Sequence, residues 1–181
     1  MLTPRQLPAA TQDEAALKIP APAVDARALR QALGQFATGV TVIATRTAAG
    51  QVVGLTANSF GALSLEPPLI VWALRVSSHH LALFEAADTF VVNVLSEAQV
   101  DLSRKFASHV DDKFDGVAFA PNQHGHPLIH GAAAWFDCRT VSKQIAGDHC
   151  LFIAQVERFT SSETAPLLFH AGAYFTLGSQ L

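Results

Sequence analysis

A run of small polar residues between Gly54 and Pro68 is the first place where this sequence could do chemistry. Its hydroxyl and amide side chains provide uncharged hydrogen-bonding groups, and the glycines and alanines beside them let a ligand approach the backbone. The polar residues are Thr56, Asn58, Ser59 and Ser64, and the small ones are Gly54, Ala57, Gly61 and Ala62. This combination suits phosphate or ribityl oxygens. The alternative is an ordinary polar loop between two strands, closed by two prolines.

Two other polar groups follow apolar segments. Ser77–His79 comes directly after the apolar stretch Leu69–Arg75. Its donors could bind phosphate or could cap the next helix, because both roles use the same backbone groups. His149 follows a Gly-Asp pair, where a histidine commonly does no more than hydrogen-bond the turn. From the residues alone, the turn role is the better interpretation of His149.

Other histidines and both cysteines are weaker candidates. His124, His126 and His130 have plausible metal-ligand spacing, but no cysteine or carboxylate accompanies them in a segment rich in glycine and proline. We therefore interpret them as surface histidines and predict no metal site. Cys138 and Cys150 alternate with apolar residues and are predicted to be buried, unreactive thiols. The sequence has no GxGxxG and no GxxxxGK[ST] motif, which disfavours a Rossmann site and a P-loop.

Length and composition limit the class of protein. A chain of 181 residues suits one domain with a single core. Hydrophobic residues make up 50% and charged residues 15%, a low charge content that predicts an oligomer with apolar surface covered by a partner subunit. A net charge of −3 without a basic stripe argues against nucleic acid and anionic membranes as partners. Two cysteines, no signal-like segment and no membrane-length apolar run predict a cytoplasmic protein.

The amino-terminal part divides into a tail and the start of the domain. Residues 1–24 contain four prolines and many alanines and are predicted to be a flexible or arm-like segment. Residues 25–181 are predicted to form the domain. Asp25 is a predicted N-cap of a helix whose apolar residues recur at helical spacing until Gly39 and should pack on the sheet.

The rest of the chain alternates β-branched segments with turns. Strands are predicted at Val40–Arg46, Val52–Ala57, Leu69–Arg75, Phe90–Leu95, Ala133–Lys143, Cys150–Phe159 and Ala173–Leu177, and helices at Leu81–Ala87 and Glu97–Ala107. Asp111–His130, interrupted by glycine and proline, is predicted to be a long loop. Many strands with hairpin-like connections and few helices indicate an antiparallel barrel, because parallel neighbours need crossover helices.

Several motifs, in this order, resemble the short-chain NAD(P)H:flavin oxidoreductases, a flavin reductase-like family. They are Leu33-Gly-Gln-Phe-Ala-Thr-Gly-Val-Thr-Val-Ile-Ala-Thr45, Thr56-Ala-Asn-Ser59, Pro67-Pro-Leu-Ile-Val71, Ser77-Ser78, Phe90-Val-Val-Asn-Val-Leu95, Phe106-Ala107 and Gly147-Asp-His149. The resemblance implies a mainly β fold with flanking helices, the antiparallel split β-barrel of the FMN-binding type. It also implies a homodimer with flavin near the subunit seam.

The resemblance further implies which residues contact the cofactors. FMN or FAD would be contacted by Thr38, Gly39, Val40, Thr41, Thr56, Ala57, Asn58, Ser59, Ser64, Ser77, Ser78, His79 and Phe106. Tyr174 would lie near the dinucleotide site, with a barrel-closing aromatic role as the alternative. His149 would be the catalytic residue that shapes the site of NADH or NADPH, which reverses the interpretation from the turn alone. Relatives often have a basic residue where this chain has His79, so we expect modest flavin affinity.

The activity that the resemblance implies is hydride transfer from NAD(P)H to flavin. The protein would supply reduced flavin to a partner flavin-dependent monooxygenase. Two alternatives remain at this point. One is a flavin-binding split barrel without a monooxygenase partner, and the other is a barrel that binds a group other than flavin, such as haem.

Overall fold

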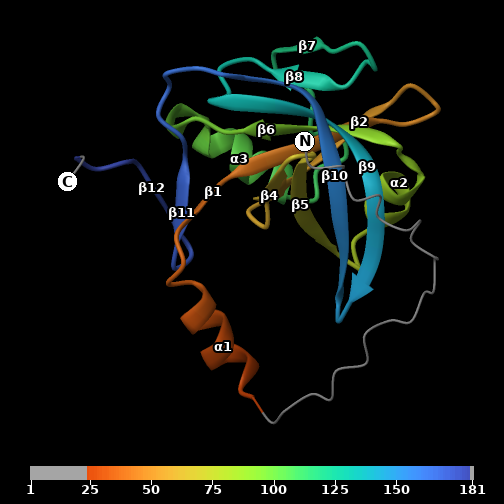
Figure 1. Cartoon of the computed structure of the whole chain (residues 1–181). Helices are drawn as coiled ribbons and strands as arrows, with labels where there is room; N and C mark the ends of the chain where they lie inside the picture. The colour runs from red at the N-terminus through yellow and green to blue at the C-terminus, as the bar shows by residue number, and fades with distance from the viewer. Residues whose placement is uncertain (1–23, 180–181) are drawn as a thin grey trace, which may run out of the picture.

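The computed structural model describes residues 24–179, so the predicted amino-terminal segment lies almost entirely outside the described residues. Its main strands are β2 (Thr41–Arg46), β3 (Val52–Ala57), β4 (Gly61–Leu65), β5 (Pro68–Arg75), β6 (Thr89–Val94), β9 (Ala134–Ala146) and β10 (His149–Ser161). They form one antiparallel sheet in the order β3-β2-β6-β9-β10-β5-β4 (Figure 1). This confirms the predicted mainly β, antiparallel class.

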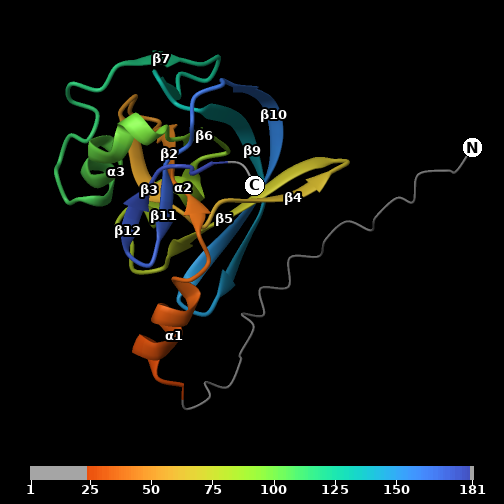
Figure 2. The same cartoon turned by 90° about the vertical axis from the view of Figure 1, so that its left-hand side faces the viewer.

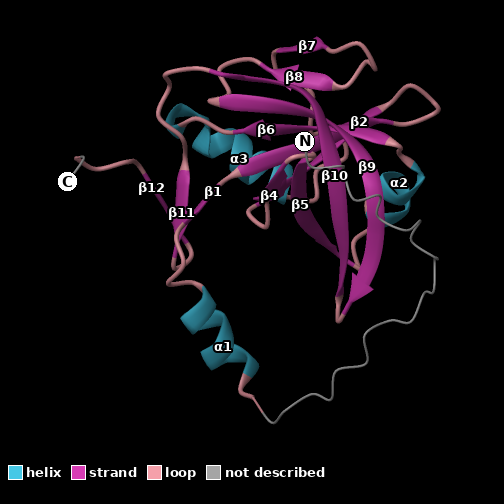
Figure 3. Cartoon of the chain, in the orientation of Figure 1, coloured by secondary structure: helices cyan, strands magenta, loops and turns pink. Residues whose placement is uncertain are grey.

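The remaining elements are short. Two small sheets contain β1 (Thr38–Gly39), β11 (Leu168–His170) and β12 (Ala173–Phe175), and β7 (Phe119–Pro121) and β8 (Pro127–Ile129). The helices are α1 (Ala26–Leu33), α2 (Leu81–Ala86), the 3-10 turn η1 (Glu97–Gln99) and α3 (Val100–Ala107) (Figure 3). No described helix is long and apolar enough to cross a membrane.

The core lies on both faces of the sheet. In β2, Ile43 belongs to one buried cluster while Val42 and Ala44 belong to the other, because side chains alternate across a strand. Burial on both sides explains why this segment is apolar without alternation. Trp72, which is completely buried, stacks on Phe152 with ring centroids 4.5 Å apart. This tryptophan is therefore part of the core.

β9 and β10 form a hairpin, which agrees with two predicted strands separated by the Gly-Asp turn. Its two-residue turn is Gly147-Asp148, and the φ of 62° at Gly147 is a left-handed conformation that glycine adopts without strain. Both strands are longer than predicted, because β9 extends to Ala146 and β10 begins at His149. The ends of both strands next to the turn are exposed, so their residues show no apolar alternation in the sequence. The backbone hydrogen bonds between the strands nevertheless continue to the turn.

The first helix differs from the prediction. Asp25 does cap it, accepting a hydrogen bond from the backbone N–H of Arg27 at 2.8 Å, but the helix ends at Leu33 rather than near Gly39. None of its residues is buried, and it stands apart from the sheet at the bottom of Figure 1. The prediction that it packs on the sheet of its own chain is wrong. Its apolar spacing predicted a helix with an apolar face, but spacing does not say what surface meets that face.

Two predicted loops contain strands. Within Gly54–Pro68, only Asn58–Phe60 and the turn Glu66-Pro67 lie outside strands, and β4 pairs with the edge of β5. Within Asp111–His130, β7 and β8 form a hairpin that Asn93 ties to the sheet: its amide donates to Pro127 O at 3.2 Å, and its carbonyl accepts from Ile129 N at 2.8 Å. These pairings depend on partners distant in sequence, which local turn signals do not reveal.

Candidate functional site

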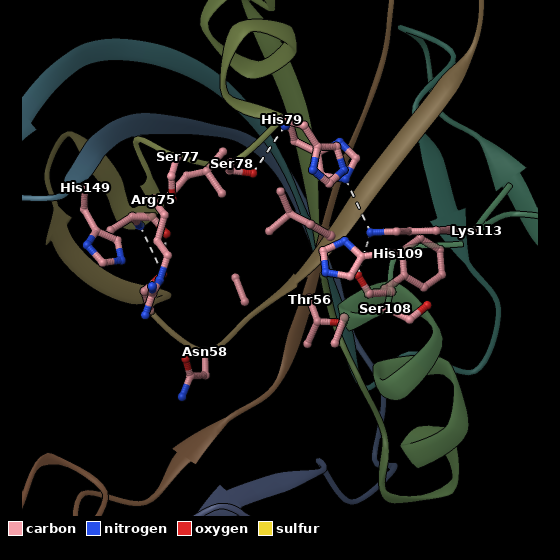
Figure 4. Close-up of a pocket in the computed structure, with 18 residues that line it drawn as sticks. Thr56, Asn58, Arg75, Ser77, Ser78, His79, Ser108, His109, Lys113 and His149 are labelled. Carbon is pink, nitrogen blue, oxygen red and sulfur yellow. Dashed lines mark hydrogen bonds between the residues drawn. The ribbon is translucent and has the colours of Figure 1, made fainter. Parts of the chain in front are cut away.

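A cavity of about 490 Å³ lies where the end of β3, the end of β5 and the end of α3 meet. It brings together many of the predicted site residues, which come from distant parts of the sequence (Figure 4). These are Thr56, Ala57, Asn58, Ser59, Ser77, Ser78, His79, Phe106 and His149. The other lining residues are Leu55, Ala73, Leu74, Arg75, His80, Ala107, Ser108, His109 and Lys113.

One wall is built by α3 packing against β3. The side chain of Phe106 is almost fully buried, and a Cβ placed on Gly54 would come within 3.0 Å of its ring. Glycine at this position therefore lets the ring lie directly on the strand. The hydroxyl of Thr56 donates to the backbone carbonyl of Ser103 in α3 at 2.7 Å. This helix and strand consequently hold one another in place, with Figure 2 showing α3 beside β3 (Figure 2).

Ser59 connects the β3–β4 segment to β5. Its hydroxyl donates to Ala73 O at 2.9 Å and accepts from Ala73 N at 3.0 Å. The hydroxyl proton is therefore already used inside the protein. The exposed side chain of Asn58 makes no hydrogen bond with the described residues, so its amide is available to a ligand. These neighbours in the predicted polar stretch have different roles.

His149 lines the cavity and also contacts its own turn. Its Nδ1 lies 2.8 Å from Asp148 Oδ1, and this hydrogen bond is the main cause of the lowered pKa of Asp148. The side chain of His149 is 38% exposed, which leaves part of the ring open to a ligand. Both interpretations weighed for this histidine are thus compatible with its position. Arg75 is on the neighbouring strand at the same end of the cavity.

The opposite end contains residues that sequence reasoning missed. Ser108, His109 and Lys113 face the cavity there, at the end of α3 and in the following turn. Asp112 builds that turn by accepting from the backbone N–H groups of Phe114 and Asp115 at 3.0 and 3.1 Å. Lys113 lies among acidic residues in the sequence, a pattern typical of a solvated surface, and only Phe114 beside it signalled burial.

Some predicted cofactor contacts do not line this cavity. Thr38 and Gly39 pair with β11, and Ser64 lies in β4. The side chains of Val40 and Thr41 are buried, and the Thr41 hydroxyl donates to Ala57 O at 2.7 Å. The cavity gives no support to a ligand contact by these five residues, and such contact remains a prediction.

Tyr174 also lies outside the cavity lining, behind α3. Its hydroxyl is 2.9 Å from the Ser103 hydroxyl, and the Ser103 carbonyl accepts from Thr56. The guanidinium of Arg104 lies over its ring at 5.7 Å from the centroid. Tyr174 therefore supports the helix that forms a wall of the cavity, and both its place near a dinucleotide and its barrel-closing role stay predictions.

The His124–His130 segment also requires a correction. His126 is buried, with only 4% of its surface exposed, so the interpretation of all three residues as surface histidines is wrong for this one. Its Nδ1 accepts from Arg46 N at 3.0 Å and its Nε2 is 2.8 Å from the Thr89 hydroxyl. Both cysteines are buried and unpaired as predicted, and burial raises the pKa of each thiol.

Comparison with known proteins identifies the family. The flavin reductase-like domain model matches residues 33–178. The chain belongs to this family. It is 44% identical over 83% of its length to the reductase component of a flavin-dependent trigonelline monooxygenase from Acinetobacter baylyi, and 39% identical over 83% of its length to the FMN reductase (NADH) SmoA from Agrobacterium fabrum, of which 85% is matched.

Solved structures give the same result for this flavin reductase-like chain. The Streptomyces globisporus NADH:FAD oxidoreductase SgcE6, solved with NAD and FAD fragments, superposes with a TM-score of 0.81 at 34% identity, covering 87% of this chain and 98% of that one. The chain spans 48% of the Acinetobacter baylyi reductase component and 49% of a probable flavin reductase from Rhizobium meliloti. It therefore corresponds to about half the length of these relatives.

The cavity fits a flavin on the chemistry of its own residues. Leu55, Ala57, Ala73 and Leu74 provide apolar surface for a flat ring, and the Asn58 amide provides a hydrogen-bonding group beside it. A buried donor is also left over. His80 Nε2 lies 3.3 Å from the Lys113 ammonium and accepts from it, so the ring proton resides on Nδ1, which has no hydrogen-bond partner among the described residues. Unpaired buried donors favour a ligand that carries acceptor oxygens.

Proposed function

We propose that the chain is an NAD(P)H-dependent flavin reductase that uses FMN or FAD. The observation that carries this proposal is the charge of the cavity: none of its lining residues is acidic, although the whole chain has a net charge of −3. Arg75 lies at one end and Lys113 at the other, with uncharged polar and apolar groups between them. Flavin nucleotides and pyridine nucleotides both combine an aromatic ring with phosphate, which matches this arrangement.

When both are bound, the nicotinamide supplies a hydride and the flavin accepts it. The residues of this chain orient the flavin and nicotinamide rings relative to one another. Asn58 offers its unpaired amide to the flavin ring or ribityl chain, while Phe106 and Gly54 close the wall behind the ring and exclude water. His149 borders the same cavity at the end where the nicotinamide is proposed to bind. Holding two rings in contact replaces a bimolecular encounter and is a major source of rate acceleration.

Steady-state assays test this activity. NADH and NADPH are each combined with FMN, FAD and riboflavin, and oxidation of the nicotinamide is followed at substoichiometric protein. The proposal expects turnover of added flavin with at least one nicotinamide. Purified protein that shows a haem absorbance band and no such turnover would instead support the haem-type alternative.

We also propose that reduced flavin passes to a partner monooxygenase. The trigonelline relative, a reductase component, supports this role. Mixing the reductase with excess FMN and NADH under anaerobic conditions should reduce many flavins per protein. Reduction that stops after one flavin per site would instead indicate a flavin-binding protein without a monooxygenase partner.

We further propose a homodimeric split barrel in the cytoplasm. Large apolar side chains are exposed on α1, β4 and β10, where Leu33 is 66%, Leu65 92% and Phe159 70% exposed. Exposed apolar surface on this scale is unfavourable for an isolated monomer and suits a second copy of the chain. Light scattering should give twice the chain mass. Leu33→Glu should shift the equilibrium toward monomer, whereas Arg27→Glu on the same helix serves as a control for added negative charge.

A further inference from the structure

The Gly147-Asp148 turn places a carboxylate directly beside His149. Asp148 Oδ1 lies 2.8 Å from His149 Nδ1, and the side chain of Asp148 is 82% exposed while that of His149 is 38% exposed. Of the two residues, only His149 contributes to the cavity lining (Figure 4). The histidine ring therefore has one nitrogen at the turn carboxylate and part of its surface in the cavity.

Backbone hydrogen bonds hold this pair in place. His149 is the first residue of β10 and pairs with Ala146 of β9 on one side and with Arg75 of β5 on the other. The backbone carbonyl of Asp148 accepts from the backbone N–H of Val76 at 2.9 Å. The ring and the carboxylate thus project from one fixed corner of the sheet, so little backbone entropy is lost when they meet.

The carboxylate decides which ring nitrogen carries the proton. The hydrogen bond from His149 lowers the pKa of Asp148, so this group is ionised at neutral pH and can only accept hydrogen bonds. Nδ1 is therefore the donor, which leaves Nε2 without a proton in the neutral ring. Among residues 24–179, no hydrogen bond engages Nε2. The ring consequently offers a free hydrogen-bond acceptor to a ligand in the cavity.

An acceptor nitrogen discriminates between the two ends of a carboxamide. The amide of nicotinamide has an NH2 donor and a carbonyl acceptor, and an unprotonated ring nitrogen can bind only the NH2. The nicotinamide ring also becomes cationic as its hydride leaves. A neutral imidazole backed by a carboxylate is electrostatically more favourable beside that charge than an imidazolium.

We infer that Asp148 is a positioning residue for the nicotinamide: it keeps the proton of His149 on Nδ1, so that Nε2 accepts a hydrogen bond from the carboxamide NH2. This inference rests on the proposed function and names the group of the coenzyme that His149 recognises. A site that binds an N–H group rejects an analogue lacking it, because the acceptor is then left unpaired. The preferred ligand is therefore a pyridine nucleotide with an intact amide.

Nuclear magnetic resonance of the histidine rings tests the tautomer without requiring turnover. In nitrogen-15-labelled protein at about pH 8, above the ordinary histidine pKa of about 6.5, long-range proton–nitrogen spectra show which nitrogen of each ring carries the proton. The signals of His149 are those missing from His149→Ala. We expect a proton on Nδ1 in the parent and a shift toward the Nε2–H form in Asp148→Ala. Glu163→Ala, which removes an exposed carboxylate outside the cavity lining, is the matched control and should keep the parental pattern.

Nucleotide binding tests what Nε2 recognises. Adding NAD+ to the flavin-loaded parent should move the Nε2 signal of His149 upfield, the response of a ring nitrogen that begins to accept a hydrogen bond. 3-Acetylpyridine adenine dinucleotide, in which a methyl ketone replaces the amide, should leave the signal in place. In equilibrium titrations the parent should bind NAD+ about fivefold more tightly than this analogue, the size of one hydrogen bond, and Asp148→Ala should bind the two within about twofold of one another. The FMN affinity of Asp148→Ala should equal that of the parent.

Other results overturn the inference. A parental His149 ring with a proton on Nε2 would show that no acceptor is presented to the cavity. An unchanged tautomer in Asp148→Ala would leave the carboxylate with its turn role only. Equal binding of NAD+ and the analogue by the parent would show that Nε2 does not recognise the amide, and this comparison needs no variant. Absence of nicotinamide oxidation with any flavin would refute the proposed reductase activity, whereas the ring spectra and the NAD+ titrations decide the role of Asp148 separately.

Discussion

Replacing His126 should change how stability depends on pH. The neutral ring accepts a hydrogen bond at Nδ1 from Arg46 N, and its Nε2 contacts the Thr89 hydroxyl. The ring therefore connects the β7–β8 turn to the sheet. Asn122 completes this connection, because its carbonyl accepts from His126 N and its amide donates to the buried carboxylate of Asp137. Protonation of Nδ1 would remove the acceptor for Arg46.

The magnitude follows from the pKa of His126, which burial, then His124 and Arg46, lower from 6.5 to about 4. Since the folded state binds the proton less tightly than the unfolded state, stability is complete above pH 6.5 and falls as the pH drops from 6.5 toward 4. Linkage with these two values gives a loss of about 2 kcal/mol between about pH 7.5 and pH 5.0. His126→Gln should remove this contribution, because an amide supplies an acceptor and a donor without titrating in this range.

Urea unfolding at these two pH values measures the effect. The parent should lose about 2 kcal/mol more than His126→Gln on acidification, whereas the exposed His130→Gln should behave as the parent does. Other titrating groups, His80 among them, act equally in parent and variant and cancel in this difference. If the parent and His126→Gln lose the same free energy, the ring does not need to be neutral and the hydrogen bond to Arg46 is not what holds the turn.

Three further substitutions test the cavity. Asn58→Leu should raise the flavin dissociation constant by roughly fivefold or more with unchanged stability, because an available amide is lost at a proposed contact; equal flavin titrations would refute this contact. Ser59→Val removes two hydrogen bonds to Ala73, so it should lower the free energy of unfolding in urea by about 1–2 kcal/mol and should also weaken flavin binding. Ser142→Ala, at an exposed position of β9, is the control. His149→Ala should slow flavin reduction by NADH in stopped-flow mixing by about tenfold with little change in flavin affinity; a parental rate would leave the histidine with its turn role only.

Local signals in the sequence were enough for much of the fold. The β-branched segments predicted the strands of an antiparallel sheet, Asp25 predicted a helix start, and Gly147-Asp148 predicted a hairpin turn. These features depend on backbone preferences of a few neighbouring residues, so they can be read directly. The polar stretch around Asn58 also predicted part of the cavity, because its residue types differ from the apolar strands beside it.

Tertiary structure decided the features that depend on distant partners. Lys113 has the sequence surroundings of a solvated lysine, and only the packing of Phe114 on Phe106 brings it into the cavity. His126 has the surroundings of a loop histidine, yet contacts with β2 and β6 bury it. Conversely, α1 has an apolar face that its own chain leaves exposed. Burial and charge environment are sums over long-range contacts, so the same residue type acquires a different role according to what the fold places beside it.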